Sequence, residues 1–319
     1  MKVPLHRFCR LLCGIVLALF FQAACADGRE QREALDRRYV SDIFRIYYTA
    51  EGANAFVGRM AGSATSGELA QRLGKQLDHG YRFYSGVVGL IPPFANPRYR
   101  NVNAIDVHVV DLGGKNGSAG DTPFVYRYRN FDDSIPALTI SISSHWKPGN
   151  LTPEHEVFHA FQYGYTFFKN GWFLEGQARS IGSAFDGQGF QSAPLPRNAI
   201  ELRQLLTRTA DAAPFWNRLM LLCDQACPVS WSGTSYHPKV RICGDRFLKS
   251  SLEEFQKIDK EAAQARGINP NDWPEREQRS EVNNFWLLRG LARTMEKQCP
   301  IASDAELRSF YSLLGEQGQ

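Results

Sequence analysis

Two histidines and a glutamate stand together in His155-Glu156-Val157-Phe158-His159, an H-E-x-x-H pattern. Residues four apart lie on the same face of a helix, so His155 and His159 can bind one metal ion. Glu156 lies one step further around that helix, where its carboxylate can reach a metal-bound water without being a ligand. The pattern therefore predicts a zinc (Zn2+) centre with Glu156 as the general base.

A third ligand is expected from the stretch that follows, Trp172-Phe173-Leu174-Glu175-Gly176. Zinc in a hydrolytic site takes three protein ligands and keeps one position open for water. Lys169-Asn170-Gly171 is a plausible helix break, which would place Glu175 at the start of a second helix packed against the first. Glu175 is thus the natural third ligand.

The start of the first helix is also indicated by the sequence. Thr152 is a good N-cap, Pro153 suits the first helical position, and Glu154 complements the positive end of the helix dipole. These residues place H-E-x-x-H in the first two turns of a helix, which is the context that the motif needs.

H-E-x-x-H followed by W-x-x-E-G-x-A resembles the gluzincin metallopeptidases, the thermolysin-like and aminopeptidase-like zinc enzymes. The resemblance implies that His155, His159 and Glu175 bind zinc and that Glu156 is the catalytic base. Two features depart from the family pattern. Fifteen residues, 160–174, separate His159 from Glu175, fewer than in the best-known members, and Arg179 stands where thermolysin-like enzymes have an aspartate.

The resemblance also implies an α+β fold of the gluzincin kind, with zinc in a cleft between two lobes. The N-terminal lobe, residues 27–165, is expected to hold a small mixed sheet and the H-E-x-x-H helix, and the C-terminal lobe, 166–319, to be helical. The residues support strands where apolar and polar positions alternate, and a capping box made by Thr65 and Glu68 predicts a helix. The predicted strands are 44–48, 105–109, 124–128 and 138–143.

The last of these strands, 138–143, is expected at the edge of the sheet. Free backbone groups on an edge strand can pair with an extended peptide, so this strand is the predicted site of substrate pairing. The Gly-rich segment 113–120 is expected to be a hairpin connection or surface flap. Its Lys115 is followed by Asn116, so it lacks the ending of a phosphate-binding loop.

Residues 1–26 are predicted to be a signal peptide, so the mature protein is expected in the periplasm or outside the cell. The alternative is a lipoprotein anchored through Cys25, but Gln22 is unusual at the start of a lipidation signal. The signal features are a basic start, a short apolar run and an A-x-A cleavage site: Lys2, Arg7 and Arg10; Leu11 to Phe21; Ala24-Cys25-Ala26.

The rest of the chain holds 34 basic and 33 acidic side chains, a balance that gives no electrostatic case for binding nucleic acid or an anionic membrane. No other stretch predicts a membrane span. The expected partner is a peptide or protein substrate, and the oligomeric state is left open. The four cysteines beyond the signal segment predict two disulfides with three possible pairings: Cys223, Cys227, Cys243 and Cys299.

A peptide hydrolase usually adds a tyrosine or histidine that donates a hydrogen bond to the oxyanion, and Tyr236 and His237 are candidates for this role. The sequence thus predicts an exported zinc metallopeptidase. One alternative is a zinc hydrolase of an ester, an epoxide or a cell-wall peptide. Another is a catalytically silent binding protein of the same fold, which the intact Glu156 disfavours. No G-x-M-E-N stretch precedes His155, which favours an open endopeptidase-like cleft or an unusual specificity over an ordinary aminopeptidase site.

Overall fold

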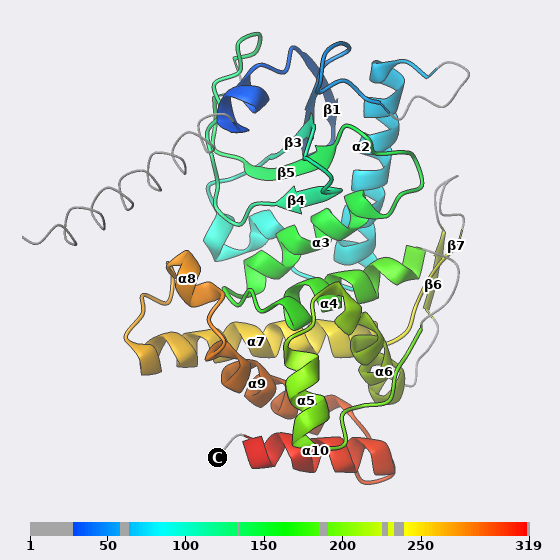
Figure 1. Ribbon diagram of the computed structural model, residues 1–319, viewed down its shortest axis with the longest axis vertical. Helices are drawn as coiled ribbons and strands as arrows, with labels where there is room; N and C mark the ends of the chain where they lie inside the picture. The colour runs from blue at the N-terminus through cyan, green and yellow to red at the C-terminus, as the bar shows by residue number, and fades with distance from the viewer. Residues whose placement is uncertain are drawn as a thin grey trace, which may run out of the picture.

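The fold is α+β, with a mixed sheet at one end of the molecule and a set of helices at the other (Figure 1). The computed structural model describes residues 28–57, 64–132, 134–185, 191–224, 229–232 and 239–317. The predicted signal peptide, Cys227, Tyr236 and His237 lie outside these ranges. The sheet end contains β1 (Arg37–Ser41), β2 (Phe44–Tyr48), α2 (Ser66–Arg82), β3 (Ile105–Val110), β4 (Gly117–Ala119), β5 (Leu138–Ser143) and α3 (Thr152–Tyr165).

The five-stranded sheet has the order β1-β2-β3-β5-β4. Strands β2, β3 and β5 run parallel to one another, while β1 and β4 pair antiparallel at the two edges. Every residue of β2 and β3 is buried, because α2 and α3 cover one face and a small apolar cluster that includes Leu35 and Tyr128 covers the other. The strands predicted at 44–48 and 105–109 are therefore confirmed.

The prediction that 138–143 forms the edge of the sheet is wrong. The segment is a strand, β5, but β4 from the Gly-rich segment pairs with it along residues 140–142 and takes the edge position. Ser141 and Ser143 are consequently buried. Three small residues, Gly-Ser-Ala, form β4, and so short a strand carries no alternating apolar pattern that would have identified it.

No strand forms at 124–128, although the sequence alternates there. The segment makes one isolated bridge between Phe124 and Ala137. Its aromatic rings instead cover the outer face of the sheet, where Tyr128 stacks on Tyr47 with ring centroids 3.7 Å apart. The alternation thus reflects packing on top of the sheet and not pairing within it.

The sequence predicted the capping residues of α2 correctly, but not the N-cap of α3. Thr65 and Glu68 form the predicted capping box at the start of α2. Thr152 is not the N-cap of α3, because the helix begins at Thr152 itself and Leu151 occupies the cap position. The side chain of Asn150 accepts hydrogen bonds from the backbone nitrogen of Thr152, at 2.9 Å, and from its hydroxyl, at 2.5 Å. The side chain of Asn150, two residues before Thr152, therefore satisfies the start of the helix.

The helical end packs below α3 and is continuous with the sheet end, since one cluster of buried apolar side chains extends from β2 to α10 among the described residues. Cys223 and Cys299 form a disulfide that joins α6 to the end of α9, and Cys243 is disulfide-bonded as well. Within the described ranges, no helix is both long and apolar enough to cross a membrane. The elements are α4 (Gly171–Gly182), α5 (Ala199–Leu206), α6 (Ala213–Cys223), β6 (Val229–Ser232), β7 (Lys239–Ile242), α7 (Asp245–Arg266), α8 (Glu275–Gln278), α9 (Asn283–Gln298) and α10 (Ala305–Gln317).

Candidate metal centre

The side chains of His155, His159 and Glu175 converge on one point between α3 and α4. The Nε2 atoms of the two histidines lie 3.0 Å apart, and Oε2 of Glu175 lies 3.1 Å from Nε2 of His155 and 3.6 Å from Nε2 of His159. All three candidate ligand atoms lie within 4.8 Å of one another. The chain folds this way because residues 166–170 leave the helical conformation after α3 and return Glu175 as the fifth residue of α4.

This donor set suits a metal ion such as zinc. Ligand atoms about 2.0 to 2.1 Å from a tetrahedral zinc ion lie about 3.3 to 3.4 Å from one another. The separations seen here, 3.0, 3.1 and 3.6 Å, lie on either side of this value. Two imidazole nitrogens and one carboxylate oxygen are also the ligand types of hydrolytic zinc sites with one open position. The three residues could therefore hold a metal ion, as the sequence predicted.

A second layer of hydrogen bonds orients His159. Nδ1 of His159 lies 2.8 Å from Oε1 of Gln162, while Nε2 of Gln162 donates to the carbonyl of Leu174 and to Oε1 of Gln177. Because the amide nitrogen of Gln162 already has two acceptors, its oxygen must face His159 and accept the Nδ1 proton. The lone pair of His159 is then on Nε2, the atom that points at the other two ligands.

The chain of hydrogen bonds continues into the helical end of the molecule. Nε2 of Gln177 donates to Oγ of Ser251 at 3.1 Å, and Ser251 donates in turn to the carbonyl of Leu248. Gln162, Gln177 and Ser251 are all buried. The orientation of His159 is therefore set jointly by α3, α4 and α7.

The pKa values of the two acidic groups of the site, Glu175 and Glu156, are shifted in opposite directions. Burial opposes ionisation of Glu175, but the hydrogen bonds from His155 and His159 outweigh it and hold its pKa well below the usual range. Burial raises the pKa of Glu156 to about 7, against the lowering effect of His159. Glu175 is thus suited to be a permanently charged ligand, and Glu156 to exchange a proton near neutral pH.

Strand β4 passes directly over the carboxylate of Glu156. A Cβ atom placed on Gly117 would lie 2.7 Å from Oε1 of Glu156 and 2.6 Å from Cγ2 of Thr152. Real Cβ atoms do not approach other atoms so closely, so only glycine fits at this position. Gly117 therefore allows the edge strand to lie against the first turn of α3.

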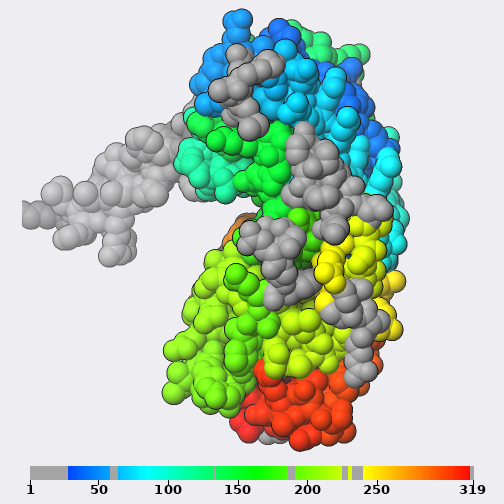
Figure 2. Space-filling model, turned by 90° about the vertical axis from the view of Figure 1, so that its right-hand side faces the viewer, coloured from blue at the N-terminus to red at the C-terminus, as the bar shows by residue number. Residues whose placement is uncertain are grey.

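Two of the three candidate ligands, His155 and Glu175, line a cleft of about 600 Å³. Asn116 and Gly117 of β4 and its preceding loop line one side, α3 contributes His155 and Glu156, and α4 contributes further residues including Arg179. Figure 2 shows the molecule hollowed between its sheet end and its helical end. A second cavity, of about 530 Å³, lies beside the link between α3 and α4, but none of the three candidate ligands lines it.

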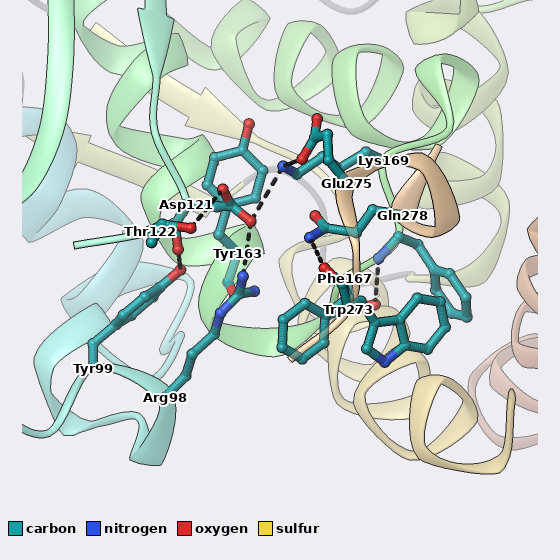
Figure 3. A network of polar contacts seen from close by, with 12 residues as sticks. Arg98, Tyr99, Asp121, Thr122, Tyr163, Phe167, Lys169, Trp273, Glu275 and Gln278 are labelled. Atoms are coloured by element: carbon teal, nitrogen blue, oxygen red, sulfur yellow. Dashed lines mark hydrogen bonds and ion pairs between the residues drawn. The ribbon is translucent and has the colours of Figure 1, made fainter. Parts of the chain in front are cut away.

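Buried charges hold the end of β4 against the helical end. Asp121, two residues after β4, accepts from Arg98 at 2.8 Å and lies 3.2 Å from Nζ of Lys169, which also pairs with Glu275 of α8 at 2.6 Å. Figure 3 shows Asp121 between the two cations, with the ring of Tyr163 alongside. The side chain of Lys169 is 5% exposed, so this contact is shielded from solvent. The network fixes the strand that borders the cleft.

The structure thus brings together four of the residues that the sequence singled out, His155, Glu156, His159 and Glu175, while Tyr236 and His237 lie outside the described residues. Sequence reasoning missed the roles of Gln162 and Gly117. Gln162 lies three residues after His159 on the same helix, a spacing that allows contact, but nothing in the pattern marked it.

A search against protein-family models, against curated proteins and against solved structures finds no match to this chain.

Proposed function

We propose that this protein is an exported zinc-dependent peptidase of the gluzincin kind, with His155, His159 and Glu175 as metal ligands and Glu156 as the general base. The observation that carries the proposal is the meeting of the three ligand atoms within 4.8 Å, beside a buried carboxylate, at the wall of an open cleft. A purely structural metal site is closed and has no use for a carboxylate in that place.

Zinc bound at this point would supply a Lewis acid that polarises a peptide carbonyl and lowers the pKa of a water. Glu156 would accept a proton from the attacking water; its pKa of about 7, raised by burial, would be lowered by the charge of a bound ion. Glu156 then returns that proton to the leaving amine. His155 and His159 would hold the ion through Nε2, an orientation that Gln162 fixes for His159.

Strand β4 is the surface that we propose for binding the peptide backbone. Ser143 donates to the carbonyl of Asn116 at 2.9 Å, and Gly120 donates to the carbonyl of Thr139 at 2.8 Å, so alternate residues of this strand bond to β5. In an antiparallel pair, the backbone groups of the intervening residues, Gly117 and Ala119, face the free edge. An extended peptide pairing there would lie across Glu156.

The disulfide chemistry of the chain supports the proposed export. The disulfide between Cys223 and Cys299 is typical of an oxidising compartment, in agreement with the signal peptide proposed for residues 1–26. Tyr236 and His237 remain the proposed donors to the oxyanion. Replacing each separately, by phenylalanine and by glutamine, should lower kcat without loss of metal, and an unchanged kcat in both variants would remove them from the mechanism.

The proposal is tested by incubating the zinc-loaded protein, from Asp27 onward, with a peptide mixture of defined sequences and detecting new termini by mass spectrometry. Glu156→Gln is the matched control, since it keeps the shape of the side chain and all three ligands. Cleavage by the wild type and none by Glu156→Gln, at equal zinc content, is expected. Absence of cleavage by the loaded wild type, or equal cleavage by both, would overturn the proposal.

A further inference from the structure

Arg179 is the only lysine or arginine among the described residues that line the cleft. It lies on α4 four residues after Glu175, and its side chain is exposed. In the part of the chain that the structure describes, Arg179 has neither a hydrogen-bond nor an ion-pair partner. Some other arginines of the protein are paired, as Arg98 is with Asp121 and Arg218 with Glu306. The cleft thus offers one uncompensated cation beside the metal ligands.

Arg179 does not serve the metal ligands in the way that an aspartate at this position would. A guanidinium has no acceptor, so it cannot take the Nδ1 proton of His155. Nor does it neutralise Glu175, whose carboxylate oxygen points at the two histidines. Arg179 is nevertheless close to the site, because it lines the same cleft as His155 and Glu175.

The charge balance of the zinc-loaded site also indicates that Arg179 does not serve the metal ligands. A divalent ion would be balanced by Glu175 and by ionised Glu156, and Arg179 would then leave one positive charge without a counter-ion among the described residues that line the cleft. The missing partner is an anion, and a planar guanidinium matches a carboxylate by two parallel hydrogen bonds.

The distance along α4 between Arg179 and Glu175 limits how far from the metal a carboxylate bound by Arg179 can lie. Four residues of helix separate Arg179 from Glu175 by about 6 Å along the axis, and their side chains project from the same face. An extended peptide covers about 3.5 Å per residue. A carboxylate held by Arg179 is therefore about one or two residues from a carbonyl placed at the metal.

Building on the proposed function, we propose that Arg179 is the specificity anchor of the cleft, and that substrates carry a carboxylate within about two residues of the hydrolysed bond. The carboxylate is either the free C-terminus of a peptide or the side chain of an aspartate or glutamate. Loss of the anchor raises KM and leaves kcat little changed, because the contact is made in the ground state as well as in the transition state.

The test measures binding, with turnover blocked. Zinc-loaded Glu156→Gln protein is titrated calorimetrically with N-acetylated peptides in matched pairs. One pair differs only in a free C-terminus against a C-terminal amide. The other pair, amidated throughout, differs in one glutamate against glutamine. We expect the acidic member of at least one pair to bind about tenfold tighter or more, and the pair that shows the preference identifies the source of the carboxylate.

Three substitutions added to Glu156→Gln decide whether Arg179 is responsible. Arg179→Gln abolishes the preference, Arg179→Lys keeps part of it, and Arg203→Gln, an exposed arginine of α5 outside the cleft lining, leaves it intact. Zinc content is measured for each, to show that the ligand set is unchanged. A preference that survives in Arg179→Gln, no preference in either pair, or no binding by any peptide overturns the anchor.

Failure of the proposed function gives a different result. If the zinc-loaded wild type cleaves no peptide but binds acidic members preferentially through Arg179, the anchor stands and the hydrolytic role falls. If the wild type cleaves peptides with no preference for a nearby carboxylate, the hydrolytic role stands and the anchor falls.

Discussion

The amide oxygen of Gln162 lies 2.8 Å from Nδ1 of His159, one turn further along α3, and holds the imidazole with Nε2 toward His155 and Glu175. Partners of this kind fix both the tautomer and the ring orientation of a metal-binding histidine. The site therefore includes, besides its three candidate ligands, a buried glutamine that orients one of them.

Gln162→Leu should weaken zinc affinity by roughly 10- to 100-fold, since the Nδ1 proton loses its acceptor and the ring becomes free to turn. The affinity is measured by competition with a chelating dye. Gln204→Leu, on the exposed face of α5, is the control and should bind zinc as the wild type does. Equal affinities for the two variants would show that Gln162 does not orient the ligand.

Gly117→Ala should lower kcat at least about tenfold while zinc content stays unchanged. The added methyl group would sit 2.7 Å from Oε1 of Glu156, so the carboxylate or the strand has to move, and small displacements of catalytic groups are costly. Gly86→Ala is the matched control, because its methyl group meets no atom within 4 Å. Steady-state kinetics with metal analysis checks this. Full activity in Gly117→Ala would show that catalysis does not depend on the exact position of the Glu156 carboxylate.

Lys169→Met should destabilise the fold and loosen the end of β4. The substitution leaves the buried Asp121 with Arg98 as its one cation among the described residues, while the exposed Glu275 keeps Arg279. Loss of a partner by a buried polar group costs about 1 to 3 kcal/mol. Thermal unfolding should show the loss, and KM should rise more than kcat falls.

The control for this change is Lys249→Met, which removes an exposed pair with Glu253 at 4.0 Å. Such surface pairs contribute little, so its Tm should stay close to that of the wild type. A Tm drop of the same size in both variants would assign the effect to general loss of charge and not to the network around Asp121.

Asp259→Asn should change how stability depends on pH. Burial raises the pKa of Asp259 to about 7, although its Oδ2 accepts from the backbone nitrogen of Phe167 at 3.1 Å. Between about pH 4 and pH 7 the unfolded chain has released this proton and the folded chain has not. The unfolded state binds fewer protons there, so the contribution of Asp259 makes the wild type less stable as pH rises through this window.

Asparagine keeps an oxygen for Phe167 and has no charge to bury. The variant should therefore match the wild type near pH 4 and exceed it at pH 8 by roughly 2 to 4 kcal/mol in the free energy of unfolding. Denaturant titrations of both proteins, with chelator present, measure that difference. If the difference between the two proteins is independent of pH, Asp259 does not titrate as described.

Local signals in the sequence predicted the parts of the fold that depend on nearby residues. Thr65 and Glu68 cap α2 by contacts three residues apart, and alternation identified β2 and β3. The convergence of His155 and His159 follows from a spacing of four residues on one helix. Each of these features is settled within a turn or a strand, where pattern and structure are directly linked.

Features that depend on segments distant in the sequence could not be predicted from local patterns. The edge position went to β4, because three small residues without any apolar pattern pair with β5 and lie over α3. The alternating aromatics of 124–128 cover the sheet instead of joining it. Tertiary packing decides such outcomes, and a single sequence carries little trace of it.

The most direct measurement is the amount of metal bound per chain in the wild type and in Glu175→Ala, purified from Asp27 onward and offered zinc. We expect one zinc per wild-type chain, and little in Glu175→Ala because one of three converging ligands is gone. Gly86→Ala should retain zinc as the wild type does. No zinc in the wild type, or full retention in Glu175→Ala, would contradict the assignment of His155, His159 and Glu175 as the metal centre.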